Sequence, residues 1–96
     1  MQVINRTMDG PVTLTENTEL WGTVMGDVTV SASCKLEVKG SVQGNMVIER
    51  GAVVYVDGSV IGDVKNAGRI EVYGLLKGQI IDAGGEVYID GRAMVL

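Results

Sequence analysis

Four heptapeptides share one pattern: GTVMGDV at 22–28, GSVQGNM at 40–46, GSVIGDV at 58–64 and GLLKGQI at 74–80. Each begins with glycine, has an aliphatic residue at its third position and returns to glycine at its fifth. The copies start sixteen to eighteen residues apart, and Gly91 lies seventeen residues after the start of the last copy. Self-similarity at a fixed short period indicates a repeat architecture, in which each repeat is one structural unit stacked on the next.

Apolar and polar residues alternate around each copy. From Leu36 to Ile48 the even positions are aliphatic residues or glycine, whereas the odd positions are mostly polar. Two aliphatic columns continue the alternation upstream of the glycines. They are Leu20, Val38, Val56, Val72 and Ile89, and Leu36, Val54, Ile70 and Val87. A period of two is typical of β-strands with one buried face, so the pattern predicts short strands that wind into coils.

We therefore predict an all-β protein with one domain, residues 1–96, folded as a triangular parallel β-helix (β-solenoid) of about five coils of 16–18 residues. Residues 20–96 are expected to form the regular coils, and residues 1–19 an irregular first coil at the N-terminal edge. The glycines are expected at tight corners, where no side chain fits inside or where φ is positive. The alternative is that they mark the turns of a β-sandwich.

Composition excludes several classes of function. The formal net charge is −4 and the eight Lys and Arg residues are scattered, so no nucleic-acid partner is expected. There is no His, which excludes Ser-His-Asp and Cys-His pairs and imidazole-bound metal. The single cysteine, Cys34, lies on the inward parity and is interpreted as a small core residue rather than a nucleophile. We predict no enzymatic activity, no catalytic residue and no cofactor.

One column of oxygen-bearing side chains directly follows the second glycines: Asp27, Asn45, Asp63 and Gln79. Stacked oxygens of this kind could hold calcium. Asp and Asn after a corner glycine more often serve the turn itself, and only two of the four are carboxylates. We therefore interpret the column as structural and predict no metal site.

The four aromatic residues, Trp21, Tyr55, Tyr73 and Tyr88, fall on outward columns of one face of the predicted prism. Tyrosine and tryptophan dominate binding hot spots, so these residues form a candidate protein-binding face. The alternative is that they decorate a strand surface and pack across strands.

The repeat Gly-x-Val-x-Gly-Asp/Asn, with its alternating aliphatic residues, resembles the bactofilins over residues 20–96. The resemblance implies a bacterial, right-handed parallel β-helix that polymerises end to end without nucleotide, as a cytoplasmic scaffold at the inner face of the cell envelope. It supplies no catalytic residues. Family members use an apolar contact near the terminal coil, for which Met94, Val95 and Leu96 are the candidates here. No membrane-targeting peptide is evident in residues 1–10, so direct membrane binding is not expected.

Two functions follow from these patterns. The first is a non-enzymatic scaffold that self-associates through open solenoid ends, because the alternation continues to the last residues and unpaired strand edges invite further strands. The alternative is a small protein-binding module, such as an immunity protein or antitoxin, that blocks a partner. Its acidity and its aromatic face would suit that role.

Overall fold

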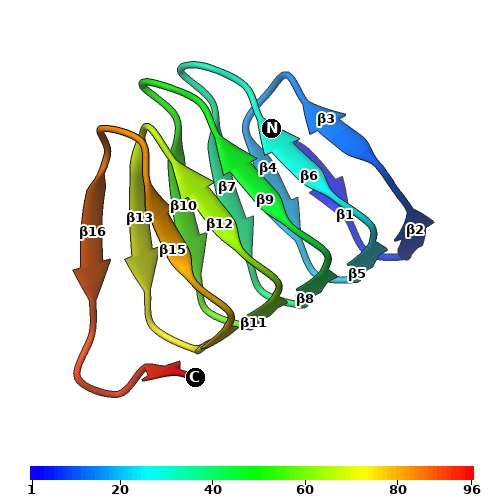
Figure 1. Ribbon diagram of the computed structural model, residues 1–96. Coiled ribbons are helices and arrows are strands. Elements are labelled where there is room, and N and C mark those ends of the chain that lie inside the picture. The colour runs from blue at the N-terminus through cyan, green and yellow to red at the C-terminus, as the bar shows by residue number, and fades with distance from the viewer.

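The computed structural model describes residues 1–96 and contains seventeen short strands in three parallel sheets (Figure 1). Sheet A consists of β1 (Gln2–Ile4), β4 (Thr18–Leu20), β7 (Lys35–Val38), β10 (Val53–Val56), β13 (Arg69–Val72) and β16 (Glu86–Ile89). Sheet B consists of β2 (Thr7–Asp9), β5 (Thr23–Met25), β8 (Ser41–Gln43), β11 (Ser59–Ile61), β14 (Leu75–Lys77) and β17 (Met94–Val95). Sheet C consists of β3 (Val12–Leu14), β6 (Val28–Val30), β9 (Met46–Ile48), β12 (Val64–Asn66) and β15 (Ile80–Asp82).

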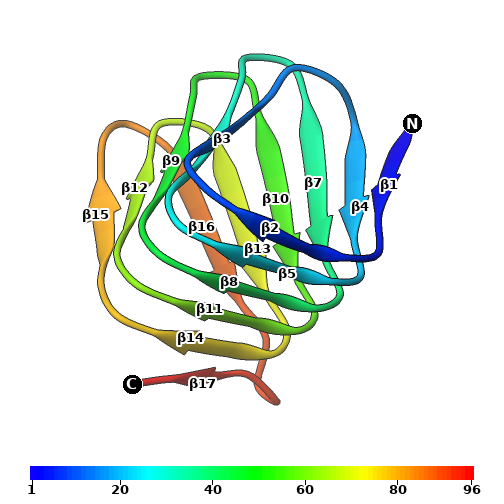
Figure 2. The same ribbon diagram turned by 90° about the vertical axis from the view of Figure 1, so that its right-hand side faces the viewer.

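Successive strands belong to sheets A, B and C in turn, so one circuit of the three sheets makes one coil. Each strand pairs in parallel with its equivalent in the neighbouring coils; Leu36, Val54 and Ile70, for example, are register partners in β7, β10 and β13. Figures 1 and 2 show the coils stacked along one axis. The predicted parallel β-solenoid is confirmed. It has six coils rather than about five, and the sixth contributes strands to sheets A and B alone.

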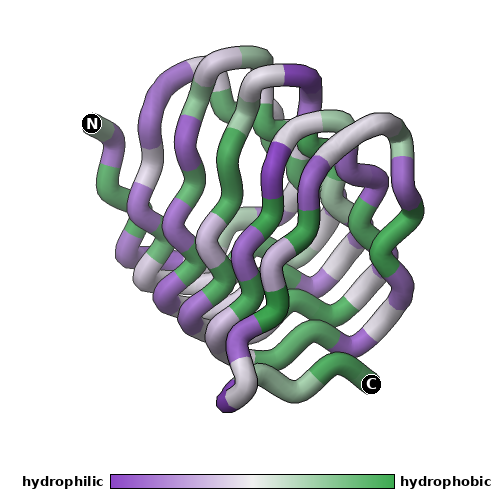
Figure 3. Tube along the Cα trace, turned by 90° about the vertical axis from the view of Figure 1, so that its left-hand side faces the viewer, coloured by the Kyte–Doolittle hydropathy of each residue, from purple (hydrophilic) through white to green (hydrophobic).

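Alternation within the strands decides which side chains are buried. In β10, Val54 and Val56 point inward and are fully buried, whereas Val53 and Tyr55 are partly exposed. The same rule produces one continuous core of 20 buried apolar side chains, most of them Val, Leu or Ile. Figure 3 shows the resulting alternation of hydrophobic and hydrophilic residues around the coils. The inward columns expected from the sequence are the ones that form this core.

Two polar side chains are buried with the aliphatic ones. The Thr18 hydroxyl donates a hydrogen bond to the Glu16 carbonyl at 3.0 Å. The Asn66 side-chain amide donates to the Glu86 carbonyl at 2.8 Å and so links the fourth coil to the sixth. Each of these bonds offsets part of the cost of removing a polar group from water.

The first glycine of each motif is required because the neighbouring coil lies too close for a side chain, and the second has the positive φ that was expected. A Cβ added to Gly58 would lie 1.9 Å from the carbonyl oxygen of Gly40, its equivalent in the preceding coil, and Gly40 has the same relation to Gly22. The missing side chain would therefore point into the backbone of the neighbouring coil. The second glycine series has the expected positive φ, which is 147° at Gly62.

Residues 1–19, expected as an irregular first coil, contain β1, β2 and β3, which pair in parallel with β4, β5 and β6. Arg6 lies opposite Gly22, and Met8 pairs with Val24, so this coil lacks the first glycine of the motif. In the structure no coil packs on the other side of Arg6. A side chain is therefore tolerated at this corner, which hides the repeat in the sequence.

Gly91 does not continue the glycine column. Ile89 pairs with Val72, an offset of 17 residues, whereas Met94 pairs with Leu75, an offset of 19. The corner between β16 and β17 therefore contains two additional residues. Gly91 lies in this longer corner, where an added Cβ would meet no atom within 4 Å.

The chain contains no helix with the length and apolarity needed to cross a membrane.

Candidate functional site

All four aromatic side chains lie on the outside of sheet A. Tyr55 and Tyr88 stand in one column on either side of Glu71, while Trp21 and Tyr73 directly follow β4 and β13. The chain has twelve acidic and eight basic residues, and ten of these twenty charged residues lie on or beside the same surface. They are Glu19, Glu37, Asp57, Glu71, Glu86 and Asp90, with Lys35, Lys39, Arg69 and Arg92. We call these ten side chains and the four aromatics the outer face of sheet A.

Lysines cover two of the aromatic rings. The Lys39 Nζ lies 5.9 Å from the ring centroid of Trp21, and the Lys35 Nζ lies 5.9 Å from that of Tyr55, both within the range of a cation–π interaction. Lys39 also binds the Asp57 carboxylate at 2.8 Å. This hydrogen bond, together with the carboxylate's charge, raises the pKa of Lys39 above its ordinary value.

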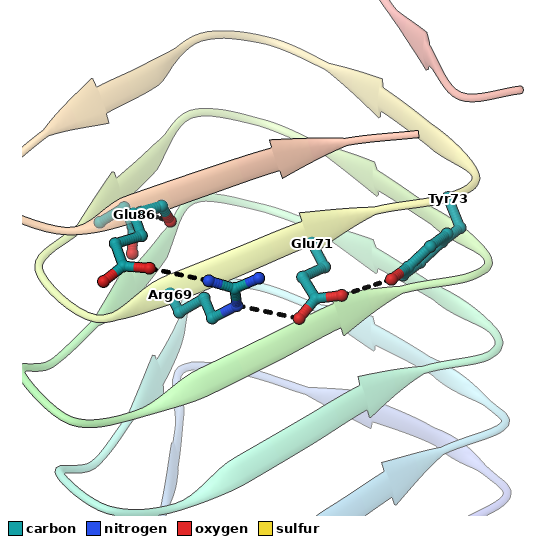
Figure 4. Close-up of polar contacts among 5 residues, drawn as sticks. Arg69, Glu71, Tyr73 and Glu86 are labelled. Carbon is teal, nitrogen blue, oxygen red and sulfur yellow. Dashed lines mark hydrogen bonds and ion pairs between the residues drawn. The ribbon is translucent and has the colours of Figure 1, made fainter. Parts of the chain in front are cut away.

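Of the other two aromatic residues, Tyr73 belongs to a hydrogen-bonded chain that crosses β13 and β16 (Figure 4). The Tyr73 hydroxyl donates to Glu71 Oε1; Arg69 donates to Glu71 Oε2 at 2.9 Å and to Glu86 Oε2 at 2.7 Å. The Tyr73 ring packs against Tyr88, with centroids 5.9 Å apart and planes tilted by 50°. The bond from Tyr73, followed by the bond from Arg69, holds the pKa of Glu71 below its ordinary value.

The phenol of Tyr73 is expected to lose its proton at a higher pH than an ordinary tyrosine. Its bond to the Glu71 carboxylate raises its pKa from the ordinary 10.0 to about 12, because the phenolate would lose that bond and face a like charge. The folded-state pKa exceeds the unfolded one, so this contribution to stability is complete below pH 10 and is lost as pH rises through about 12.

In a spectrophotometric titration of the three tyrosines, Glu71→Gln should lower the highest of the three pKa values, which belongs to Tyr73, and Glu37→Gln should leave it unchanged. An unchanged titration in Glu71→Gln would contradict the assignment.

The oxygen-bearing column after the second glycines links adjacent coils. Asp27 Oδ1 accepts the Asn45 backbone N–H at 2.9 Å, Asn45 Oδ1 accepts that of Asp63 at 3.0 Å, and Asp63 Oδ1 accepts that of Gln79 at 3.0 Å. Asp27, Asn45 and Asp63 thus each satisfy a backbone donor of the next coil, a structural role that links coils instead of closing the turn. Cys34 is buried in the core cluster, as its parity indicated.

The candidate end-contact residues lie in and just after the last strand. Met94 and Val95 form β17 and pair with β14, and the Leu96 N–H donates to the Leu76 carbonyl at 2.9 Å. Val95 is in register with buried Leu76 and therefore faces the core axis, whereas Met94 and Leu96 are offset from it by one residue and face outward. All three side chains are exposed.

Sequence reasoning did not single out two other residues of this end, Val87 and Ile89. They pair with Ile70 and Val72, which are fully buried, yet they are 47% and 46% exposed because no further strand covers them. Their membership of the inward columns was visible in the sequence. The signal that was overlooked is that they are the last members of those columns.

The first coil covers its own core more completely. Ile4 and Leu14 are only 2% and 5% exposed, and Met8 and Val12 pack against the core cluster. The solenoid therefore has one end where the core is covered and one where inward-facing aliphatic side chains are open. Figure 3 shows the apolar residues that run to the C-terminus at that open end.

Residues 4–80, about four fifths of the chain, match the family model of the bactofilins, which is described as polymer-forming cytoskeletal. No curated protein matches this chain. No solved structure matches it either.

Proposed function

Because this chain belongs to the bactofilins, a family of polymer-forming cytoskeletal proteins, we propose that it is a non-enzymatic scaffold subunit. Copies of the chain join end to end along the solenoid axis and use the C-terminal end as one contact surface. The joined coils extend the stack from one molecule to the next.

The observation that carries this proposal is the exposure of core-type residues at one end. Val87, Ile89 and Val95 continue columns that are fully buried in the fifth coil, and they are 47%, 46% and 42% exposed. Complete burial of an aliphatic side chain of this size is worth about 1.5–3 kcal/mol. A second molecule that covers all three would recover part of this stabilisation.

The covered first coil limits the arrangement of the contact. Since Ile4 and Leu14 are nearly inaccessible, the N-terminal end has less apolar area to contribute. The C-terminal end is therefore the surface whose alteration should weaken assembly most. Candidate contact residues Met94 and Leu96 lie at the rim of this surface and widen it.

A substitution pair tests the contact. Ile89→Lys places a charge over the open core, whereas Ile61→Lys places one on the outside of sheet B, in a strand that is paired on both sides, at a residue of similar exposure, 43% against 46%. We expect Ile89→Lys to weaken self-association at least about a hundredfold, because the interface would have to bury an unpaired ammonium group. In sedimentation velocity Ile89→Lys should remain near 10.2 kDa at concentrations where Ile61→Lys and the original protein form larger species.

Equal association of the two variants would contradict the end contact. Circular dichroism and the midpoint of thermal unfolding show whether each variant is folded. If Ile89→Lys does not fold, Val87→Ser replaces it, since serine keeps a small side chain at a position that is half exposed.

Attachment to the inner face of the cell envelope is proposed from the family resemblance, and a fluorescent fusion imaged in cells would test it. The competing function, a module that blocks a partner, predicts a different outcome in the same sedimentation experiment. The protein would stay monomeric alone and form a tight complex of fixed stoichiometry with one other protein.

A further inference from the structure

The three sides of the solenoid differ in chemistry. The outward strand positions of sheet A carry four carboxylates, two basic groups and two tyrosines, and the other two aromatic residues directly follow its strands. The outward strand positions of sheet B carry one carboxylate, Asp9, and one lysine, Lys77, and those of sheet C carry only Lys65. Aromatic residues on an exposed surface are the commonest anchors of protein–protein contacts. The outer face of sheet A is thus the side best equipped to hold a partner.

Most charges on this face neutralise one another. Arg69 is bound to two carboxylates, Arg92 to Asp90 at 3.0 Å and Lys39 to Asp57. Two carboxylates are left over. Glu19 and Glu37 are register partners in adjacent strands, and no Lys or Arg nitrogen lies within 4.0 Å of either carboxylate. Like charges placed directly opposite each other destabilise a sheet, so the two carboxylates repel each other.

An exposed aromatic ring adjoins the unpaired carboxylates. Trp21 is 56% exposed, and its Nε1 donates to Glu19 Oε1 at 3.0 Å, which holds the indole beside the carboxylate. Val3, the register partner of Glu19 in β1, is also exposed and extends the apolar surface. The site therefore combines two carboxylates on adjacent strands, which are about 4.8 Å apart, with an exposed indole that Lys39 covers only in part.

We propose that the outer face of sheet A, at β4 and β7, binds an arginine-containing segment of a partner protein. The guanidinium group bridges the Glu19 and Glu37 carboxylates, and its planar surface or aliphatic stem lies on the part of the Trp21 indole that Lys39 leaves exposed. Guanidinium has several donors in a fixed planar arrangement and stacks on aromatic rings, whereas the lysine ammonium is a compact, strongly hydrated charge. The net negative charge of the face disfavours an anionic membrane or nucleic acid as its occupant.

The only tryptophan of the chain reports directly on this site. A short tryptophan-free peptide of alternating arginine and serine is titrated into the protein while Trp21 emission is recorded. We expect a saturable change, with weaker binding of a peptide in which lysine replaces arginine. Glu19→Gln combined with Glu37→Gln should weaken binding about tenfold, the effect of losing two exposed ion pairs.

The matched control removes two carboxylates elsewhere. Asp27→Asn combined with Asp63→Asn causes the same change in net charge, and asparagine is compatible with that ladder because Asn45 already occupies it. This pair of substitutions should weaken binding of the arginine peptide by less than about twofold. Equal weakening by the two pairs, or a change that does not saturate, would overturn the proposal. So would stronger binding to anionic vesicles than to the peptide.

The proposal is independent of end-to-end assembly, because the site lies on the side of the solenoid. Peptide binding by Ile89→Lys should equal that of the original protein. A loss of binding in this variant would show that the site requires the assembled form, and the single-molecule site proposed above would then be wrong.

Discussion

Alanine in place of Gly58 is expected to lower the free energy of unfolding by about 3–5 kcal/mol, much of the total stability of a small domain. The new Cβ would lie 1.9 Å from the carbonyl oxygen of Gly40. That oxygen accepts the Ser59 N–H at 3.0 Å, so the two coils cannot separate without losing the bond between them. Urea denaturation followed by circular dichroism measures the loss.

Gly91→Ala is the control for this substitution. Gly91 lies in the longer corner before β17, where an added Cβ meets no atom within 4 Å. We expect a change within about 0.5 kcal/mol, because the substitution only reduces the freedom of the unfolded chain. If Gly58→Ala and Gly91→Ala were equally stable, close approach of adjacent coils would not be the reason for the glycine column.

Ile70→Ala is expected to cost about 3–4 kcal/mol. Ile70 is fully buried in the fifth coil between Val54 and Val87, and the core cannot close around the missing atoms without shifting whole strands. Ile81→Ala removes the same atoms from an outward position of β15 that is about half exposed, and it should cost about 1 kcal/mol or less.

The denaturation midpoints of Ile70→Ala and Ile81→Ala, measured at low protein concentration, test the parity assignment. A smaller loss for Ile70→Ala than for Ile81→Ala would mean that the inward and outward faces had been exchanged. A one-residue change of register would have this effect on every strand of a sheet.

The regular coils could be predicted because their physical requirements recur in the sequence. Leu36 and Val38 must face inward and Gly40 must lack a side chain, and each requirement repeats in the next coil with the same parity. The strands of the first coil were not predicted from the motif, because Arg6 stands there at the position of the motif's first glycine, opposite Gly22. A glycine is needed only where another coil packs against its missing Cβ, so the motif weakens at the edge of the stack.

Other features depend on the register between coils, which the period alone does not specify. The offset of 17 residues that joins Ile70 to Val87 also joins Arg69 to Glu86 and completes the ion-pair chain to Glu71. Sequence reasoning placed the aromatic columns but did not select these charged residues. The stacked column Lys35–Val53–Arg69–Glu86 is the signal that could have identified them.

The burial of Asn66 was also hidden by its residue type. It pairs with Ile48, and its position in the inward column became clear only from the register of β9 and β12. A polar residue in this column carries no hydrophobic signal; its Nδ2 donates to the Glu86 carbonyl, while its Oδ1 is buried without a partner. Alternation therefore predicts the core well where each member is aliphatic and poorly where a polar residue interrupts it.

The most direct test of end-to-end assembly is small-angle X-ray scattering over a range of concentrations. A single molecule has a Cα radius of gyration of 11.5 Å. Joining through the solenoid ends predicts that the overall radius of gyration rises above this value with concentration while the cross-sectional radius stays constant. A radius that remains near the single-molecule value throughout, or a cross-section that widens as the particles grow, would contradict it.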